Sequence, residues 1–84
     1  GPNMIELWRW EMQPGEAFTS PGHPATTFEL LHVEAGALTL TLGETCRTVA
    51  VGASAVARTE IEHGYRNEGT APLVFTMTVA ELPS

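Results

Sequence analysis

The 84-residue chain contains no lysine and no aspartate, so its charged side chains are 4 arginines and 10 glutamates. The net charge of −6 argues against contact with a phosphate backbone, which requires clustered lysine and arginine. The composition is 43% hydrophobic and 17% charged, which is typical of a folded rather than a disordered chain. We therefore expect one globular domain that does not itself contact nucleic acid.

Cysteine and long apolar runs are also scarce. Cys46 is the single cysteine, which excludes an internal disulfide and a zinc site built on a cysteine pair within one chain. The apolar runs are far shorter than the roughly 18 residues of a membrane helix, and no charged leader precedes an apolar segment. These features favour a soluble, cytoplasmic protein. Residues 1–3 resemble the remnant of a cleaved tag, so we expect a single domain over residues 4–84.

Hydrophobic residues along most of the chain alternate with a period of two, and threonine and valine are frequent in the middle. This pattern is typical of strands, and no stretch shows a convincing helical period. It predicts strands over 5–12, 28–33, 38–42, 45–51, 55–58, 63–67 and 73–79. With turns every several residues, the fold class is all-β: about eight short antiparallel strands in a small sandwich or barrel, such as a jelly roll.

The first predicted strand is apolar on both faces. If Ile5 and Leu7 face the core, then Trp8, Trp10 and Met12 form a second apolar stripe that needs a cover. A chain of this length buries roughly 60% of its unfolded surface and gains stability from a second subunit. We therefore expect a homodimer, formed through sheet edges or through the Trp8/Trp10 stripe.

Two of the three histidines and one glutamate are the candidate metal-binding residues. His23 lies in a Pro-Gly-His-Pro loop, Glu29 begins the second predicted strand and His63 begins a later one. Two imidazoles and one carboxylate suit a divalent Fe, Mn, Ni or Zn ion with open coordination positions. If Glu29 points inward, the period of two directs His32 outward, so His32 is not part of the predicted site. Cys46 is expected to be a small packed residue.

Two spaced motifs carry a resemblance to a known family. Residues 21–36 place His23, Glu29 and Gly36 at the spacing of the first cupin motif, and residues 52–67 place Gly52, His63 and Asn67 at the spacing of the second. The chain therefore resembles a cupin over most of its length. This resemblance implies a small cupin-type β-barrel or jelly roll.

The same resemblance implies a metal site. In cupins two histidines and a glutamate of the first motif and one histidine of the second bind a single metal, which corresponds here to His23, Glu29 and His63. The second histidine of the first motif is Ala25, and Arg58 and Glu60 stand at the proline and glycine of the second. Three protein ligands suffice for an open site.

A finer resemblance concerns bacterial regulators that carry an N-terminal helix-turn-helix of the lambda-repressor type and a C-terminal cupin domain. It rests on residues 6–16, 29–40 and 63–67. The resemblance implies a sensor that binds a small-molecule effector, while a separate domain, absent from this sequence, contacts DNA.

The residues leave three functions open. The first is a ligand-sensing module with His63 and Tyr65 at the mouth of an apolar interior that includes Leu31, Phe75 and Met77. Such aliphatic and aromatic residues can also be ordinary core, because small barrels are filled by their own side chains. The second is a small metalloenzyme of the dioxygenase or isomerase type, and the third is a dimerisation module. We favour binding over catalysis, because no additional acid–base pair is apparent.

Overall fold

The structure is a computed structural model that describes residues 4–22, 27–59 and 61–81. Eight strands follow one another along the chain: β1 (Met4–Met12), β2 (Ala17–Ser20), β3 (Thr27–Ala35), β4 (Leu38–Leu42), β5 (Thr45–Val49), β6 (Ser54–Arg58), β7 (His63–Arg66) and β8 (Leu73–Glu81). The described residues form no helix, and therefore none that could cross a membrane. The predicted all-β class and the antiparallel pairing are confirmed.

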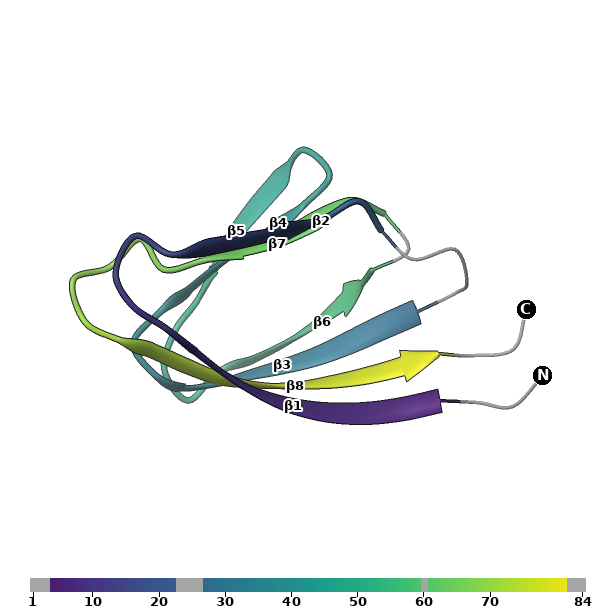
Figure 1. The fold of residues 1–84 in the computed structure, drawn as a ribbon, viewed down its shortest axis with the longest axis horizontal. Helices are drawn as coiled ribbons and strands as arrows, with labels where there is room; N and C mark the ends of the chain where they lie inside the picture. The colour runs from purple at the N-terminus through teal and green to yellow at the C-terminus, as the bar shows by residue number, and fades with distance from the viewer. Residues whose placement is uncertain (1–3, 23–26, 60, 82–84) are drawn as a thin grey trace.

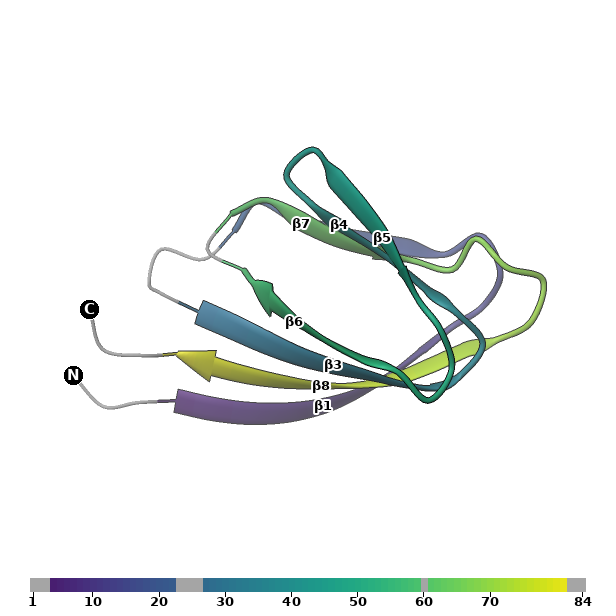
Figure 2. The ribbon, with the colours of Figure 1, turned by 180° about the vertical axis from the view of Figure 1, so that it is seen from behind.

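The strands form two antiparallel sheets that face each other. One sheet has the order β1-β8-β3-β6 and the other has the order β2-β7-β4-β5. Figure 1 and, from behind, Figure 2 show that the two layers converge at the end where the β1–β2 and β7–β8 connections lie. They diverge toward the end where β1 starts and β8 ends. The jelly roll is thus closed at one end and more open at the other.

The core lies between the layers at the converging end. Its largest fully buried apolar members are Tyr65, Phe75, Leu31, Leu38, Leu40, Leu73 and Val33. The pattern that produces this core is clearest in β8. Buried and half-buried residues alternate there from Leu73 to Ala80, so one face of the strand packs into the core. This alternation is what the period of two in residues 73–79 predicts.

The strand β2 was not among the predicted strands. It has four residues, too few to display a period, and none of its side chains is fully buried. It forms because its backbone pairs with β7, which places Phe18 opposite Tyr65 and Ser20 opposite His63. Tertiary pairing therefore creates a strand that the local sequence does not indicate.

The first strand does not have the orientation on which the predicted Trp8/Trp10 stripe depends. Ile5 and Leu7 are each 73% exposed, whereas Met12 is buried and Trp10 packs against the core. The pairing register explains this orientation, because Trp10 lies opposite the buried Phe75 and Met12 opposite the buried Leu73. Trp8, Trp10 and Met12 thus belong to the inner face, and no Trp8/Trp10 stripe covers the outside. The apolar residues that β1 exposes are Ile5 and Leu7.

Two further expectations concern single residues. His32 is exposed, as predicted, and its Nδ1 lies 2.8 Å from the Ser54 hydroxyl on the neighbouring strand β6. Cys46, expected to be packed, is exposed. The reason is that β5 is an edge strand in which only Val49 is buried.

Gly36 connects β3 to β4 where the chain passes close to the start of β8. Its φ is +76°, and a Cβ atom there would lie 2.6 Å from the carbonyl oxygen of Pro72. Gly52 has a similar φ of +82° but no atom within 4 Å of the corresponding position. A comparison of substitutions at the two glycines therefore distinguishes the effect of backbone strain from that of a steric clash.

Gly36→Ala should lower the free energy of unfolding by about 2–4 kcal/mol, because it combines left-handed strain with a backbone clash. Gly52→Ala, the matched control, should cost only the strain, about 1 kcal/mol. Urea unfolding followed by circular dichroism measures both. Equal losses for the two variants would contradict the close approach at Pro72.

Asn67 ties the converging ends of the two sheets together. Its side-chain amide donates hydrogen bonds to the carbonyls of Met12 and Ala71, both at 2.9 Å, and its Oδ1 accepts one from the Gly69 amide at 3.0 Å. The backbone of the same residue bonds to Glu16 and Gly15 in the β1–β2 turn. One buried side chain thus links the end of β1 to the connection between β7 and β8.

Asn67→Ala should lower the free energy of unfolding by about 2–4 kcal/mol, because it removes three hydrogen bonds, one of them buried and two partly buried. Ser54→Ala removes an exposed hydrogen bond and should cost less than about 1 kcal/mol. Thermal unfolding of both variants checks the comparison. A loss for Asn67→Ala no larger than that for Ser54→Ala would show that the link is dispensable.

Candidate ligand cavity

The inner face of the β1-β8-β3-β6 sheet changes from polar to apolar along the strands. The register aligns its inward residues in rows that cross β1, β8 and β3. From the diverging end, these rows are Glu6–Val79–Glu29, Trp8–Met77–Leu31 and Trp10–Phe75–Val33. Carboxylates therefore lie at the open end, and aromatic and aliphatic side chains lie deeper.

The opposite sheet supplies the other wall. Cross-strand pairing aligns Ser20 of β2 with His63 of β7 and Leu42 of β4 in one row. The next row toward the converging end aligns Phe18 and Tyr65 with Leu40 in the same way. Polar side chains of the two sheets therefore face each other at the diverging end.

A cavity of about 190 Å³ lies between these walls. Its described lining is Glu6, Trp8, Trp10, Phe18, Ser20, Thr27, Glu29, His63, Tyr65, Met77, Val79 and Glu81. The lining includes the predicted ligand-binding residues His63, Tyr65 and Met77. The predicted floor residues Leu31 and Phe75 are fully buried and do not belong to the described lining, so they support the cavity from behind.

A cluster of aromatic rings fixes the inner part of the cavity. The Trp10 ring centroid lies 5.3 Å from Phe18, 6.0 Å from Tyr65 and 5.9 Å from Phe75. Phe18 and Tyr65 stack nearly parallel at 6.2 Å. Contacts of this kind stabilise ring positions beyond the effect of burial alone. The aromatic walls are therefore held in place before any ligand binds.

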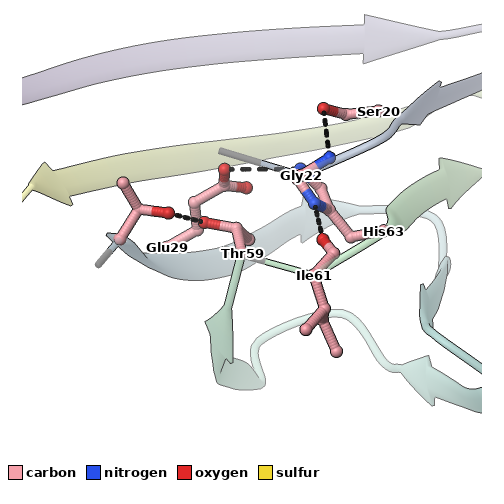
Figure 3. A network of polar contacts seen from close by, with 7 residues as sticks. Ser20, Gly22, Glu29, Thr59, Ile61 and His63 are labelled. Carbon is pink, nitrogen blue, oxygen red and sulfur yellow. Dashed lines mark hydrogen bonds and ion pairs between the residues drawn. The ribbon is translucent and has the colours of Figure 1, made fainter. Parts of the chain in front are cut away.

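His63 is buried, with 2% of its surface exposed, and it is oriented by its own chain. The Nδ1 atom lies 2.9 Å from the carbonyl oxygen of Ile61 (Figure 3). A carbonyl can only accept, so Nδ1 carries the proton of this hydrogen bond. The other ring nitrogen, Nε2, faces Glu29 at 3.7 Å from Oε2. The backbone contact fixes the ring orientation and directs Nε2 toward Glu29.

The distance between His63 and Glu29 is compatible with a shared metal ion after a small adjustment. Two ligand atoms each about 2.1 Å from one ion lie roughly 3.0–3.4 Å apart, a few tenths of an ångström closer than Nε2 and Oε2 are here. Glu29 and His63 thus fit as two ligands from opposite sheets. The third predicted ligand, His23, lies outside the described residues, and the described ones contain no group of three metal-binding side chains.

Two buried polar atoms in the lining residues lack a hydrogen-bond partner within the described part of the chain: the Tyr65 hydroxyl and the Trp10 indole nitrogen. A buried donor without a partner is destabilising by about 1–3 kcal/mol. Both belong to the cavity wall, where a ligand can supply the missing partner. The Tyr65 side chain is 1% exposed, so water does not readily supply that partner from outside the fold.

Eight residues of the described lining were not predicted as site residues: Glu6, Trp8, Trp10, Phe18, Ser20, Thr27, Val79 and Glu81. The two tryptophans follow from the orientation of β1, which the sequence analysis left open. A signal was available, because Trp8 and Trp10 alternate with the charged residues Arg9 and Glu11. Phe18 depends on the unpredicted strand β2, and no local signal indicates it.

A second groove of about 600 Å³ lies between the β4–β5 hairpin and β6. It contains Arg47 and Arg58 beside apolar residues of β4 and β6, and its described lining includes none of the predicted site residues. Arg47 and Arg58 therefore line this second groove, whereas the described lining of the first cavity has no arginine.

A two-layered jelly roll with histidine and glutamate between its sheets defines the class of protein as a cupin. The family model of the cupin domain matches residues 8–79, and the chain belongs to that family. No curated protein matches the sequence significantly.

Solved structures extend this result to particular relatives. The chain is similar to the cupin domain of an XRE-family transcriptional regulator from Enterobacter cloacae, with a TM-score of 0.83 and 21% identity over 95% of this chain and 83% of that one. It is similar to an HTH_3-family transcriptional regulator from Vibrio cholerae, with a TM-score of 0.83 and 20% identity over 95% of this chain. The chain spans 44% of the length of that regulator.

A third similar structure is a predicted oxalate decarboxylase from Thermotoga maritima. Its TM-score is 0.78, with 17% identity over 90% of this chain and 65% of that one. The shared cupin fold therefore occurs both in regulators and in a protein described as an enzyme. At these identities, the likeness shows the fold.

Proposed function

We propose that this cupin domain binds a small organic effector and serves as the sensing module of a cytoplasmic transcriptional regulator whose DNA-binding domain is separate. The observation that carries this proposal is the buried Tyr65 hydroxyl without a described partner in the wall of an apolar cavity. The similarity to cupin domains of two regulators supports the regulatory context.

The geometry suggests how such a ligand is held. Trp8, Trp10 and Met77 contact its apolar part, because they line the deeper half of the cavity. Tyr65 and the Nε2 atom of His63 provide directional hydrogen bonds, since the Ile61 carbonyl engages the other ring nitrogen of His63. A few polar groups on an apolar wall are typical of binding sites for small molecules.

A saturating effector should raise the melting temperature, because ligand binding to the native state stabilises it by about 2.7 kcal/mol at 100 times the Kd. A thermal-shift screen of small organic molecules measures this effect, and product analysis of each hit tests for turnover. Tyr65→Phe should weaken binding of a hit roughly three- to tenfold, because it removes only the hydroxyl.

Thr39→Val is the matched control, since it removes a hydroxyl that bonds to Glu68 outside the described cavity lining. It should leave the affinity for a hit unchanged. A library without any stabilising molecule would contradict the proposed function. Consumption of a hit that stops in His63→Ala would replace sensing with catalysis.

A second candidate function is that of a small metalloenzyme of the dioxygenase or isomerase type. The approach of His63 Nε2 to Glu29 Oε2 favours it, together with the similarity to a predicted oxalate decarboxylase. Glu29 and His63, with His23 as the predicted third ligand, would hold one divalent Fe, Mn, Ni or Zn ion. Such an ion supplies Lewis-acid or redox chemistry to a bound substrate.

The metal candidate predicts that protein reloaded with Fe, Mn, Ni or Zn retains one ion per chain and that His63→Ala retains none. His32→Ala is the matched control, because this histidine lies on the outer surface and contacts Ser54. Elemental analysis after dialysis measures the content. Equal metal in the His63 and His32 variants would contradict the site, as would wild-type protein that retains none of the four metals.

A further inference from the structure

The charge of the cavity lining indicates which chemical class of effector it accepts, an inference that rests on the proposed function. Three glutamates, Glu6, Glu29 and Glu81, belong to the described lining, which contains no arginine, and the sequence has no lysine. The pairing register explains their proximity. Glu6 and Glu29 flank Val79 from opposite sides, and Glu81 pairs with Thr27 in the adjacent row. Two adjacent rows of one sheet thus concentrate negative charge at the open end.

The lining is also rich in aromatic rings. Four of the six aromatic residues of the chain, Trp8, Trp10, Phe18 and Tyr65, contribute to it. Aromatic faces attract cations, and tryptophan does so most strongly. The combination of aromatic rings and carboxylates favours an organic cation and disfavours a carboxylate or phosphate ligand.

The volume of the cavity and its other polar groups further restrict the chemical class of the ligand. A volume of about 190 Å³ corresponds to about six water molecules, so the ligand is compact. The Trp10 indole N–H donates and needs an acceptor, while the Tyr65 hydroxyl can both donate and accept. A small ammonium compound with a hydroxyl or carbonyl oxygen satisfies these atoms and matches the charge of the wall.

We propose that the cavity selects a compact organic ammonium ion, with the cationic group near the carboxylates and the aromatic rings and an oxygen near Tyr65 and Trp10. Choline is a suitable probe because it combines a quaternary ammonium group with a hydroxyl. Its neutral isostere, 3,3-dimethylbutan-1-ol, has the same shape without the charge. The corresponding anion, 3,3-dimethylbutanoate, reverses the charge.

Calorimetric or NMR titration of the full chain with each probe, in chelator-containing buffer that excludes divalent metals, tests the proposal. Choline should bind about tenfold or more tightly than the neutral isostere, because the cation–π and carboxylate interactions require the charge. The anion should bind more weakly than either. The preference for choline should decrease with added salt, since its attraction to the partly exposed carboxylates is screened.

Two variants test whether residues of the cavity cause the preference for choline over its neutral isostere. Glu29→Gln should reduce the preference for choline over its isostere roughly fivefold or more, because it removes a buried negative charge. Trp8→Leu removes an aromatic face at a position that is 51% exposed, and it should reduce the preference without affecting folding. Glu11→Gln is the matched control: it removes the same charge from an exposed position outside the described lining and should leave the preference unchanged.

The outcomes separate this inference from the proposed function. If the isostere or the anion binds as well as choline, or if the library yields only neutral and anionic hits, the cation preference is wrong while small-molecule sensing stands. If choline fails to bind at all, the inference is likewise overturned. If no molecule of any charge stabilises the chain, the proposed function itself fails.

Discussion

The Asn67 side chain, buried where the two sheets converge, is the interaction on which the rest of the structure depends. Its three hydrogen bonds join the end of β1 to the β7–β8 connection, and its backbone bonds to the β1–β2 turn. In a chain of 84 residues with a small core, such links define where the layers touch. At the opposite end, where β1 starts and β8 ends, the layers diverge (Figure 1). Polar groups line the cavity at that end.

The polar end of the cavity is unfavourable for stability by itself. Glu29 and His63 are both 2% exposed, and removing an ionisable group from water destabilises a fold unless partners compensate. The contact between them and the hydrogen bond from His63 to Ile61 provide part of that compensation. An apolar pair would pack here without such support. The burial of this glutamate and this histidine therefore supports the proposed binding role.

Much of the fold could be predicted from the sequence because the period of two directly reflects alternation across a sheet. It located seven of the eight described strands, and it directed His32 outward on the condition that Glu29 points inward, which the structure confirms. It did not reveal β2, whose existence depends on pairing with β7. It also left the orientation of β1 ambiguous, because both of its faces are apolar and only the opposition of Trp10 to Phe75 determines which is inside. These two omissions, the strand β2 and the orientation of β1, explain why Trp8, Trp10 and Phe18 were not predicted to line the cavity.

The position of β1 at the edge of its sheet has a mechanical consequence for the cavity. Among the described strands, β1 is hydrogen-bonded to β8 alone, whereas β8 and β3 each have neighbours on both sides. Glu6, Trp8 and Trp10, which form one side of the cavity wall, therefore lie on an edge strand that is held by hydrogen bonds on one side only. A small outward movement of β1 widens the cavity without disrupting the β8–β3 ladder. A molecule in contact with these side chains in turn restrains the strand. Binding in the cavity would therefore make the edge of the sheet more rigid.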